Sequence, residues 1–158
     1  MLVSNFPPIR DFGRFVDVSG WDASDGGVEC PTISGAIAYD QTISGKVYMF
    51  VYNQAIHCPI LTSHLMCPIQ SQMAEVIIND IPKLLEEDPD DKTHAIIVDD
   101  PLNLNERLNV PLALKGVTSY FPYRKPKASE YEDEFIPHID MTSQAPLWEP
   151  SETVFAEQ

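Results

Sequence analysis

Two histidines and two cysteines lie close together near the middle of the chain. His57, Cys58, His64 and Cys67 fall within eleven residues, and imidazole and thiolate are ligands that zinc prefers in proteins. The spacing His-Cys-x5-His-x2-Cys matches no standard zinc knuckle. Adjacent residues of a strand point to opposite faces, so His57 and Cys58 would not easily share one metal ion. We assign no metal ligand, and expect the cysteines to be small buried apolar residues and the histidines to be partly exposed.

The same cluster offers a second chemistry, because a thiolate paired with a histidine can act as a nucleophile. Cys58 and Cys67 are each followed by proline, and neither lies on a glycine-bearing turn that would expose its sulfur. An enzyme that uses cysteine or metal chemistry between His57 and Cys67 is one of three hypotheses that the sequence leaves open, and no catalytic residue is assigned for it. The other two hypotheses are given at the end of this section.

Two acidic segments each lack part of the pattern that a site requires. Asp17-Val-Ser-Gly20 resembles the Asp-Ser/Thr-Gly turn of aspartic proteases, but Val18 stands between the acid and Ser19. We therefore expect the end of a strand followed by a loop. Glu86–Asp91 carries oxygen ligands of the kind that bind calcium. The segment has no glycine between its acids and no alternating pattern of ligands, which favours a solvated surface loop.

Short strands must position these residues. The clearest element is a β-hairpin, in which Ile33–Tyr39 and the β-branched and aromatic run Lys46–Tyr52 are joined by Asp40–Gly45. A short helix is predicted from Pro68 to about Glu75, since proline is favoured in a first helical turn. Pro111 restricts its strand to a sheet edge. The remaining predicted strands are residues 15–18, 76–78, 93–98, 109–114 and 117–121. This pattern predicts a mainly β fold, a small barrel or partial barrel with one short helix.

Composition narrows the classes of partner. The 158 residues suit one domain. Twenty-four acids against ten bases give a net charge of −14, which argues against nucleic acid or an anionic membrane as a partner. No apolar run approaches the length of a transmembrane helix, and the N-terminus has no signal-peptide pattern. An odd number of cysteines, three, favours free thiols in a reducing, cytoplasmic compartment.

The character of the chain changes near Pro122. Arg124, Lys125 and Lys127 form a small basic group, and Ala128–Gln158 then contains eight acids and no lysine or arginine. We therefore predict a β-rich domain over residues 1–121 and an irregular acidic tail or linker over 122–158. Aromatic residues spaced between acids and prolines suggest a docking peptide for a basic partner rather than a second core.

A series of motifs runs in order along nearly the whole chain. The motifs are Gly35-Ala-Ile-Ala-Tyr-Asp40, Ser44-Gly-Lys-Val-Tyr48, Asn53-Gln-Ala-Ile-His57, His64-Leu-Met-Cys-Pro-Ile-Gln70, Ile78-Asn-Asp-Ile-Pro82, Thr93-His-Ala-Ile97, Val110-Pro-Leu-Ala-Leu-Lys-Gly116, Ser119-Tyr-Phe-Pro-Tyr-Arg-Lys-Pro126 and Pro146-Leu-Trp-Glu-Pro-Ser151. In their order and spacing they resemble the pol polyprotein of copia-type LTR retrotransposons, in particular the elements of diatoms, oomycetes and some fungi.

In those polyproteins the region belongs to a retropepsin-like aspartic protease. The resemblance implies a β-rich half-pepsin lobe that works as a homodimer, in which each subunit lends one aspartate to a catalytic pair. On this interpretation the Ile33–Tyr52 hairpin is the candidate flap. Leu65–Glu75 would be the strand and short helix that close the lobe.

The chain departs from the family at the site of chemistry. It contains neither Asp-Ser/Thr-Gly nor His-Ala-Asp-Thr, so no catalytic, cofactor-binding or metal-binding residue is assigned. The leading hypothesis is an N-terminally truncated, inactive retropepsin-like fragment. Loss of the first strand would expose a sheet edge and favour poor solubility or homodimerisation. The second hypothesis is a β-domain interaction module that presents the acidic tail to a basic partner.

Overall fold

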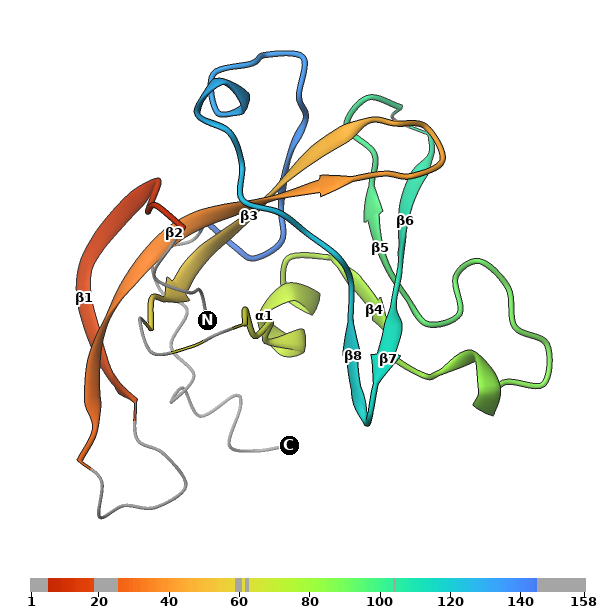
Figure 1. Cartoon of the computed structure of the whole chain (residues 1–158), viewed down its shortest axis with the longest axis horizontal. Helices are drawn as coiled ribbons and strands as arrows, with labels where there is room; N and C mark the ends of the chain where they lie inside the picture. Colours follow the sequence, from red (N-terminus) through yellow and green to blue (C-terminus); the bar gives the residue numbers. More distant parts are fainter. Residues whose placement is uncertain (1–5, 19–25, 59–60, 62, 104, 145–158) are drawn as a thin grey trace.

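The computed structural model describes residues 6–18, 26–58, 61, 63–103 and 105–144, and these form a mainly β structure with very little helix (Figure 1). The principal sheet has the order β1-β2-β3-β9 and curls into a half-barrel. Its strands are β1 (Arg10–Val18), β2 (Val28–Asp40), β3 (Val47–Ile56) and β9 (His138–Asp140). The prediction of a mainly β fold with a partial barrel is confirmed.

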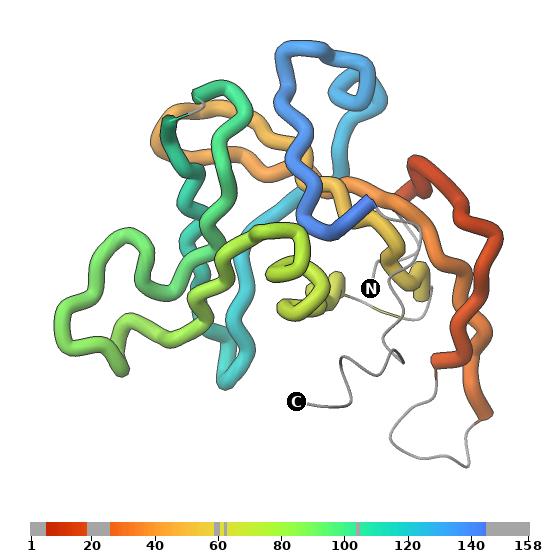
Figure 2. Tube along the Cα trace, turned by 180° about the vertical axis from the view of Figure 1, so that it is seen from behind, coloured from red at the N-terminus to blue at the C-terminus, as the bar shows by residue number. Residues whose placement is uncertain are grey.

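A second, smaller sheet packs against the half-barrel, and a separate hairpin extends from it (Figures 1 and 2). The small sheet has the order β4-β5-β6, and the hairpin consists of β7 and β8. The bounds are β4 (Ile77–Asn79), β5 (Ala95–Asp99), β6 (Arg107–Pro111), β7 (Ala113–Lys115) and β8 (Thr118–Tyr120). The helical elements are α1 (Pro68–Gln72) and two 3-10 turns, η2 (Lys83–Leu85) and η3 (Ala128–Glu130).

The predicted central hairpin is present as β2 and β3, which pair antiparallel. Its two faces are both covered. One face packs on β5 and β6 through a cluster that includes Tyr39 and Phe50, whose rings stack with centroids 5.4 Å apart. The other face carries Ala36, Ala38 and Met49 under Tyr131 and Ile136. Coverage of both faces explains why these strands read as nearly continuous apolar runs rather than as an alternation.

The same burial corrects the assignment of a flap to Ile33–Tyr52. A flap must be exposed and able to move, whereas most of this hairpin lies in the core. The exposed arm of the sheet is instead formed by β1 and the first part of β2 (Figure 1). β1 is longer than the predicted strand at 15–18 and ends at Val18, as expected for a strand end after Asp17. Ser19 and Gly20 lie outside the described residues.

The outer edge of β1 is shaped by an irregularity. Its register with β2 shifts between Asp11 and Phe15, and Gly13 between them has a φ of +65°. The Gly13 N–H donates to Asp11 Oδ1 at 2.8 Å. A bulge of this kind bends an edge strand and hinders pairing with another chain. The homodimer stays a prediction, and β1 is not a flat edge that would favour it.

The first half of the predicted tail is part of the folded body. Backbone hydrogen bonds join Arg124 to Ala38 in both directions, at 2.9 and 3.0 Å. β9 pairs in parallel with β3, and Met141 is fully buried. The body therefore extends to at least Gln144 rather than ending at Phe121. The acid-rich composition of this segment suggests a solvated tail. In the structure, Arg124 compensates the charge of the nearly buried Glu130 through two hydrogen bonds of 2.7 Å, so this acid is compatible with a folded segment. Residues 145–158 lie outside the described residues.

Other boundaries shift by small amounts. Pro111 does lie at the end of an edge strand, β6. The single strand expected over 109–114 is two strands, β6 and β7, which are separated at Leu112. The helix ends at Gln72, and turns follow it as far as Glu75, which has a φ of +64°.

Candidate functional site

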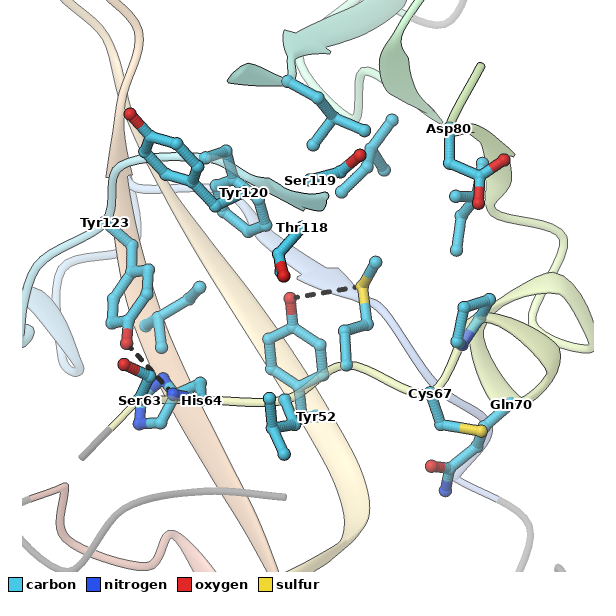
Figure 3. A pocket seen from close by; sticks show the side chains of 18 of the residues that line it. Tyr52, Ser63, His64, Cys67, Gln70, Asp80, Thr118, Ser119, Tyr120 and Tyr123 are labelled. Carbon is cyan, nitrogen blue, oxygen red and sulfur yellow. Dashed lines mark hydrogen bonds between the residues drawn. The ribbon is translucent and has the colours of Figure 1, made fainter. Parts of the chain in front are cut away.

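A groove of about 810 Å³ lies between the β7–β8 hairpin and the extended segment that leads into α1 (Figure 3). One wall is β8 and the residues after it, and the opposite wall is 63–70. Tyr52 rises from β3 into the middle of the groove, with Thr118 of β8 facing it (Figure 3). A volume of this size accommodates a short peptide or a drug-sized molecule.

The lining is apolar at its base and polar around it. Aliphatic and aromatic side chains from both sheets form the base, and polar groups stand on the walls and ends. The lining residues are Ile37, Tyr52, Ala55, Ser63, His64, Leu65, Met66, Cys67, Pro68, Gln70, Ile78, Asp80, Ile96, Leu112, Lys115, Thr118, Ser119, Tyr120, Phe121, Tyr123 and Thr142.

β8 presents a free strand edge to this groove. All three of its residues line the groove, whereas only Lys115 of β7 does. Lys115 and Thr118 pair across a two-residue connection that begins with Gly116, whose φ of +64° suits the primed turns of tight hairpins. They form the hydrogen-bonded pair next to the turn. The N–H and C=O of Ser119 therefore point away from β7. Among the described residues, no backbone group bonds to Ser119 on that side.

Two hydrogen bonds that involve His94 hold the hairpin to the body. The Leu112 N–H donates to the His94 carbonyl at 2.8 Å. His94 Nε2 lies 3.0 Å from Ser119 Oγ. His94 is buried and has a φ of +56°, a left-handed conformation that non-glycine residues seldom adopt. The conformation directs its ring toward β8 while its carbonyl meets the end of β6.

His64 closes the opposite wall. Its ring stacks on Tyr123 with centroids 4.7 Å apart and meets the edge of Phe6 at 4.3 Å. The His64 N–H donates to the Tyr123 hydroxyl at 3.3 Å (Figure 3). Both ring nitrogens are buried and have no hydrogen-bond partner among the described residues. Burial lowers the pKa of His64 to about 4, so the ring is neutral at physiological pH and behaves as an apolar surface.

The base of the groove also keeps its polar groups uncharged. The Tyr52 hydroxyl is 3.9 Å from Met66 Sδ. Burial, and to a smaller degree the neighbouring Tyr123, raise the pKa of Tyr52 well above its usual range. An aromatic base that stays neutral favours apolar side chains of a ligand over charged ones.

The cluster of two histidines and two cysteines does not form a common site. Cys58 is buried beside Cys30, where burial and the neighbouring thiol raise the pKa of Cys30. Cys67 lies at the groove just before α1, and His64 stacks on Tyr123. Within the described ranges, no three His, Cys, Asp or Glu side chains are grouped as metal ligands would be. All three cysteines are free thiols.

The two acidic candidates lie elsewhere. Asp17 is exposed on β1, in register with Glu29. The Glu86–Asp91 segment is an exposed loop, as predicted. Within it, Asp90 accepts hydrogen bonds from the Lys92 N–H and from Thr93. These bonds lower the pKa of Asp90 and organise a turn before β5.

Sequence reasoning did not identify the groove or its Ser119–His94 contact. The one local signal was the aromatic run Tyr120-Phe-Pro-Tyr123, which could have marked a wall. The other wall and the base come from β2, β3 and residues 63–70, so no contiguous motif carries the site.

Comparisons with protein-family models, with curated proteins and with solved structures find no match to this chain. Within the part of the chain that the structure describes, no helix has the length and apolar character that a bilayer crossing requires.

Proposed function

We propose that this chain is a peptide-binding β domain of a copia-type, retropepsin-like polyprotein region, and that it binds extended peptides without cleaving them. The observation that carries the proposal is the groove beside β8, where a free strand edge faces an apolar, aromatic base. The sequence motifs that resemble copia-type polyproteins support the proposed assignment of the chain to such a polyprotein. The lack of an Asp-Ser/Thr-Gly motif supports binding rather than hydrolysis.

Strand addition is the mode of binding that this geometry favours. An extended peptide would exchange backbone hydrogen bonds with the N–H and C=O of Ser119, as peptides do at other exposed sheet edges. Alternate side chains of the peptide would then point into the groove, toward Tyr52 and Met66, or out to solvent. A net charge of −14 favours peptides with basic residues on the solvent side.

A basic partner for the acidic segment is a second candidate function. Glu132, Asp133 and Glu134 are exposed beside Phe135, which is 90% exposed. Together they form an exposed acidic segment with one exposed aromatic side chain, in the turns that follow η3. Binding of a polylysine peptide that weakens steeply with salt and with Phe135→Ala would favour this function. Binding insensitive to Phe135 would count against it.

The main proposal can be tested with a short fluorescein-labelled peptide in which valine and lysine alternate around a central tryptophan. We expect saturable binding by fluorescence anisotropy, weakened about tenfold or more in Tyr120→Ala, because Tyr120 lines the groove and is 47% exposed. Val117→Ala is the matched control, since Val117 lies on the same hairpin, is fully exposed and does not line the groove. Equal affinity in both variants would exclude the groove.

Mass spectrometry of the same mixture tests the absence of cleavage. We expect the labelled peptide to stay intact. If the peptide is cleaved, and cleavage disappears in Ser119→Ala, the proposal of binding without cleavage is wrong. The Ser119–His94 pair would then be the hydrolytic site.

A further inference from the structure

We propose that Cys30 and Cys58 form a reversible redox pair, and that a peroxide converts the two thiols to a disulfide that locks the base of the exposed arm formed by β1 and the first part of β2. The proposal does not depend on peptide binding in the groove. Both thiols are free and almost completely buried, with exposed fractions of 0% and 1%. Two free thiols that face each other inside a protein can be joined with little movement of the chain.

The backbone places the two cysteines opposite each other. The His57 N–H donates to the Pro31 carbonyl at 2.9 Å, which continues the antiparallel register of β2 and β3 beyond the end of β3. One residue further along, this register sets Cys30 against Cys58. The two residues are therefore a cross-strand pair, although they are 28 positions apart in the sequence.

The pair has the backbone geometry that a disulfide requires. Because a backbone hydrogen bond joins His57 to Pro31, the next pair is a non-hydrogen-bonded one, in which Cα atoms lie about 4.5 Å apart. Disulfides join Cα atoms that are roughly 4.4–6.8 Å apart. The two side chains also meet, since burial and then a hydrogen bond with the Cys58 thiol raise the pKa of Cys30.

The bond would form where the exposed arm joins the body. Val28 and Glu29 are exposed, Cys30 is the first buried residue of β2, and on its other side it pairs with Val16 of β1. Pro31 has no N–H, so its pairing with the chain after β3 relies on the bond that its carbonyl accepts. A disulfide adds a covalent bond at this point, and thereby fixes the base of the arm.

The reaction balances with hydrogen peroxide as the oxidant. The thiolate of one cysteine attacks a peroxide oxygen and the O–O bond breaks, which gives a sulfenic acid and a hydroxide that takes up the thiol proton as water. The second thiol attacks the sulfenic sulfur, the S–O bond breaks, and a second water leaves. The two thiols lose two electrons, and the peroxide is reduced to water. A small uncharged oxidant suits a buried pair.

Peptide mapping of the full chain without reduction tests the bond. We expect peroxide treatment of the folded protein to link Cys30 to Cys58 and dithiothreitol to reverse the link. The control is the same treatment in guanidinium chloride, where Cys58 should pair preferentially with Cys67, its nearest cysteine in sequence. A Cys58–Cys67 link in the folded protein, or a link between two chains, would overturn the proposal. So would oxidation of the exposed Met73 that leaves both buried thiols unchanged.

Thermal melting tests whether the bond acts as a lock. The link closes a loop that contains the whole β2–β3 hairpin, so we expect the oxidised protein to melt about 5 °C or more above the same sample reduced with dithiothreitol. Amide exchange should slow in β1 and stay unchanged in β7 and β8. Cys30→Ser cannot form the bond and should melt alike in both conditions. A link that changes neither the melting temperature nor the exchange of β1 would show that it locks nothing.

Discussion

The β2–β3 and β7–β8 hairpins share a motif but not an environment. Both turn through a glycine with positive φ, Gly45 at +70° and Gly116 at +64°. β2 and β3 are covered on both faces, and Tyr48 and Phe50 are almost completely buried. β7 is exposed at every residue, and β8 lines the groove. One hairpin therefore stabilises the fold, whereas the other forms a wall that can meet a ligand.

The contrast is sharpest at Phe50 in the central hairpin. We expect Phe50→Ala to lower the free energy of unfolding by about 3–5 kcal/mol, because it removes a fully buried ring and leaves a cavity. Chemical denaturation measures the loss. Ile43→Ala, at a residue 95% exposed in the connection of the same hairpin, should change stability little. A loss below about 1 kcal/mol in Phe50→Ala would contradict the assignment of this hairpin to the core.

Arg124 links the central hairpin to the segment after β8. Its guanidinium bonds to both oxygens of Asp40, at 2.7 and 2.9 Å, and to both of Glu130. We expect Arg124→Gln to cost about 1–3 kcal/mol, since it leaves the nearly buried Glu130 without its main partner. Arg107→Gln is the matched control: its bridge to Asp99 is 3.3 Å long and both side chains are exposed. That change should cost about 0–0.5 kcal/mol. Equal losses would refute the special role of Arg124.

The pH dependence of stability should separate His64 from the central hairpin. Burial lowers the pKa of folded His64 to about 4, below the ordinary value near 6.5 in the unfolded chain. The unfolded state therefore binds more protons between these values, and stability falls as pH drops from about 6.5 to about 4. We expect the melting temperature of His64→Phe to depend less on pH in that window than the parent's. An unchanged profile would exclude His64 as the cause.

Glu130 should make stability depend on pH in a second, more acidic range. Arg124 lowers the pKa of Glu130 to about 2, so the stability that this carboxylate contributes is lost only as pH falls from about 4.5 toward 2. Glu130→Gln should flatten the profile there and leave the higher window unchanged, which distinguishes the two groups in one set of melting curves.

The smallest effect is expected at Ser119. Ser119→Ala removes the hydrogen bond to His94, and we expect a loss of about 0.5–1.5 kcal/mol. Amide exchange should become faster in β7 and β8 but not in β2 and β3, because the bond ties only the outer hairpin to the body. Faster exchange throughout both hairpins would show that they unfold as one unit.

Local chemistry made part of this fold predictable. The turn at Asp40–Gly45 and the β-branched run after it predicted the central hairpin, and Pro111 correctly predicted an edge. The segment 122–144 was not predictable in the same way. Its acids suggested a solvated tail, and only the distant partners Ala38 and Met49 show why it folds. The groove was hidden for the same reason, because its walls and base come from segments far apart in the chain.

The parallel pairing of β3 with β9 has a consequence for the order in which the protein folds. Met49 pairs with His138, so a whole helix, the second sheet and the outer hairpin separate the two strands in sequence. Contacts of such high sequence separation form slowly, since a long loop must close before they contribute. During synthesis, β3 is made early and its outer edge has no neighbour until residues 138–140 emerge. The nascent chain therefore exposes an apolar strand edge until residues 138–140 have been made, and the completion of the half-barrel should be its late, rate-limiting step.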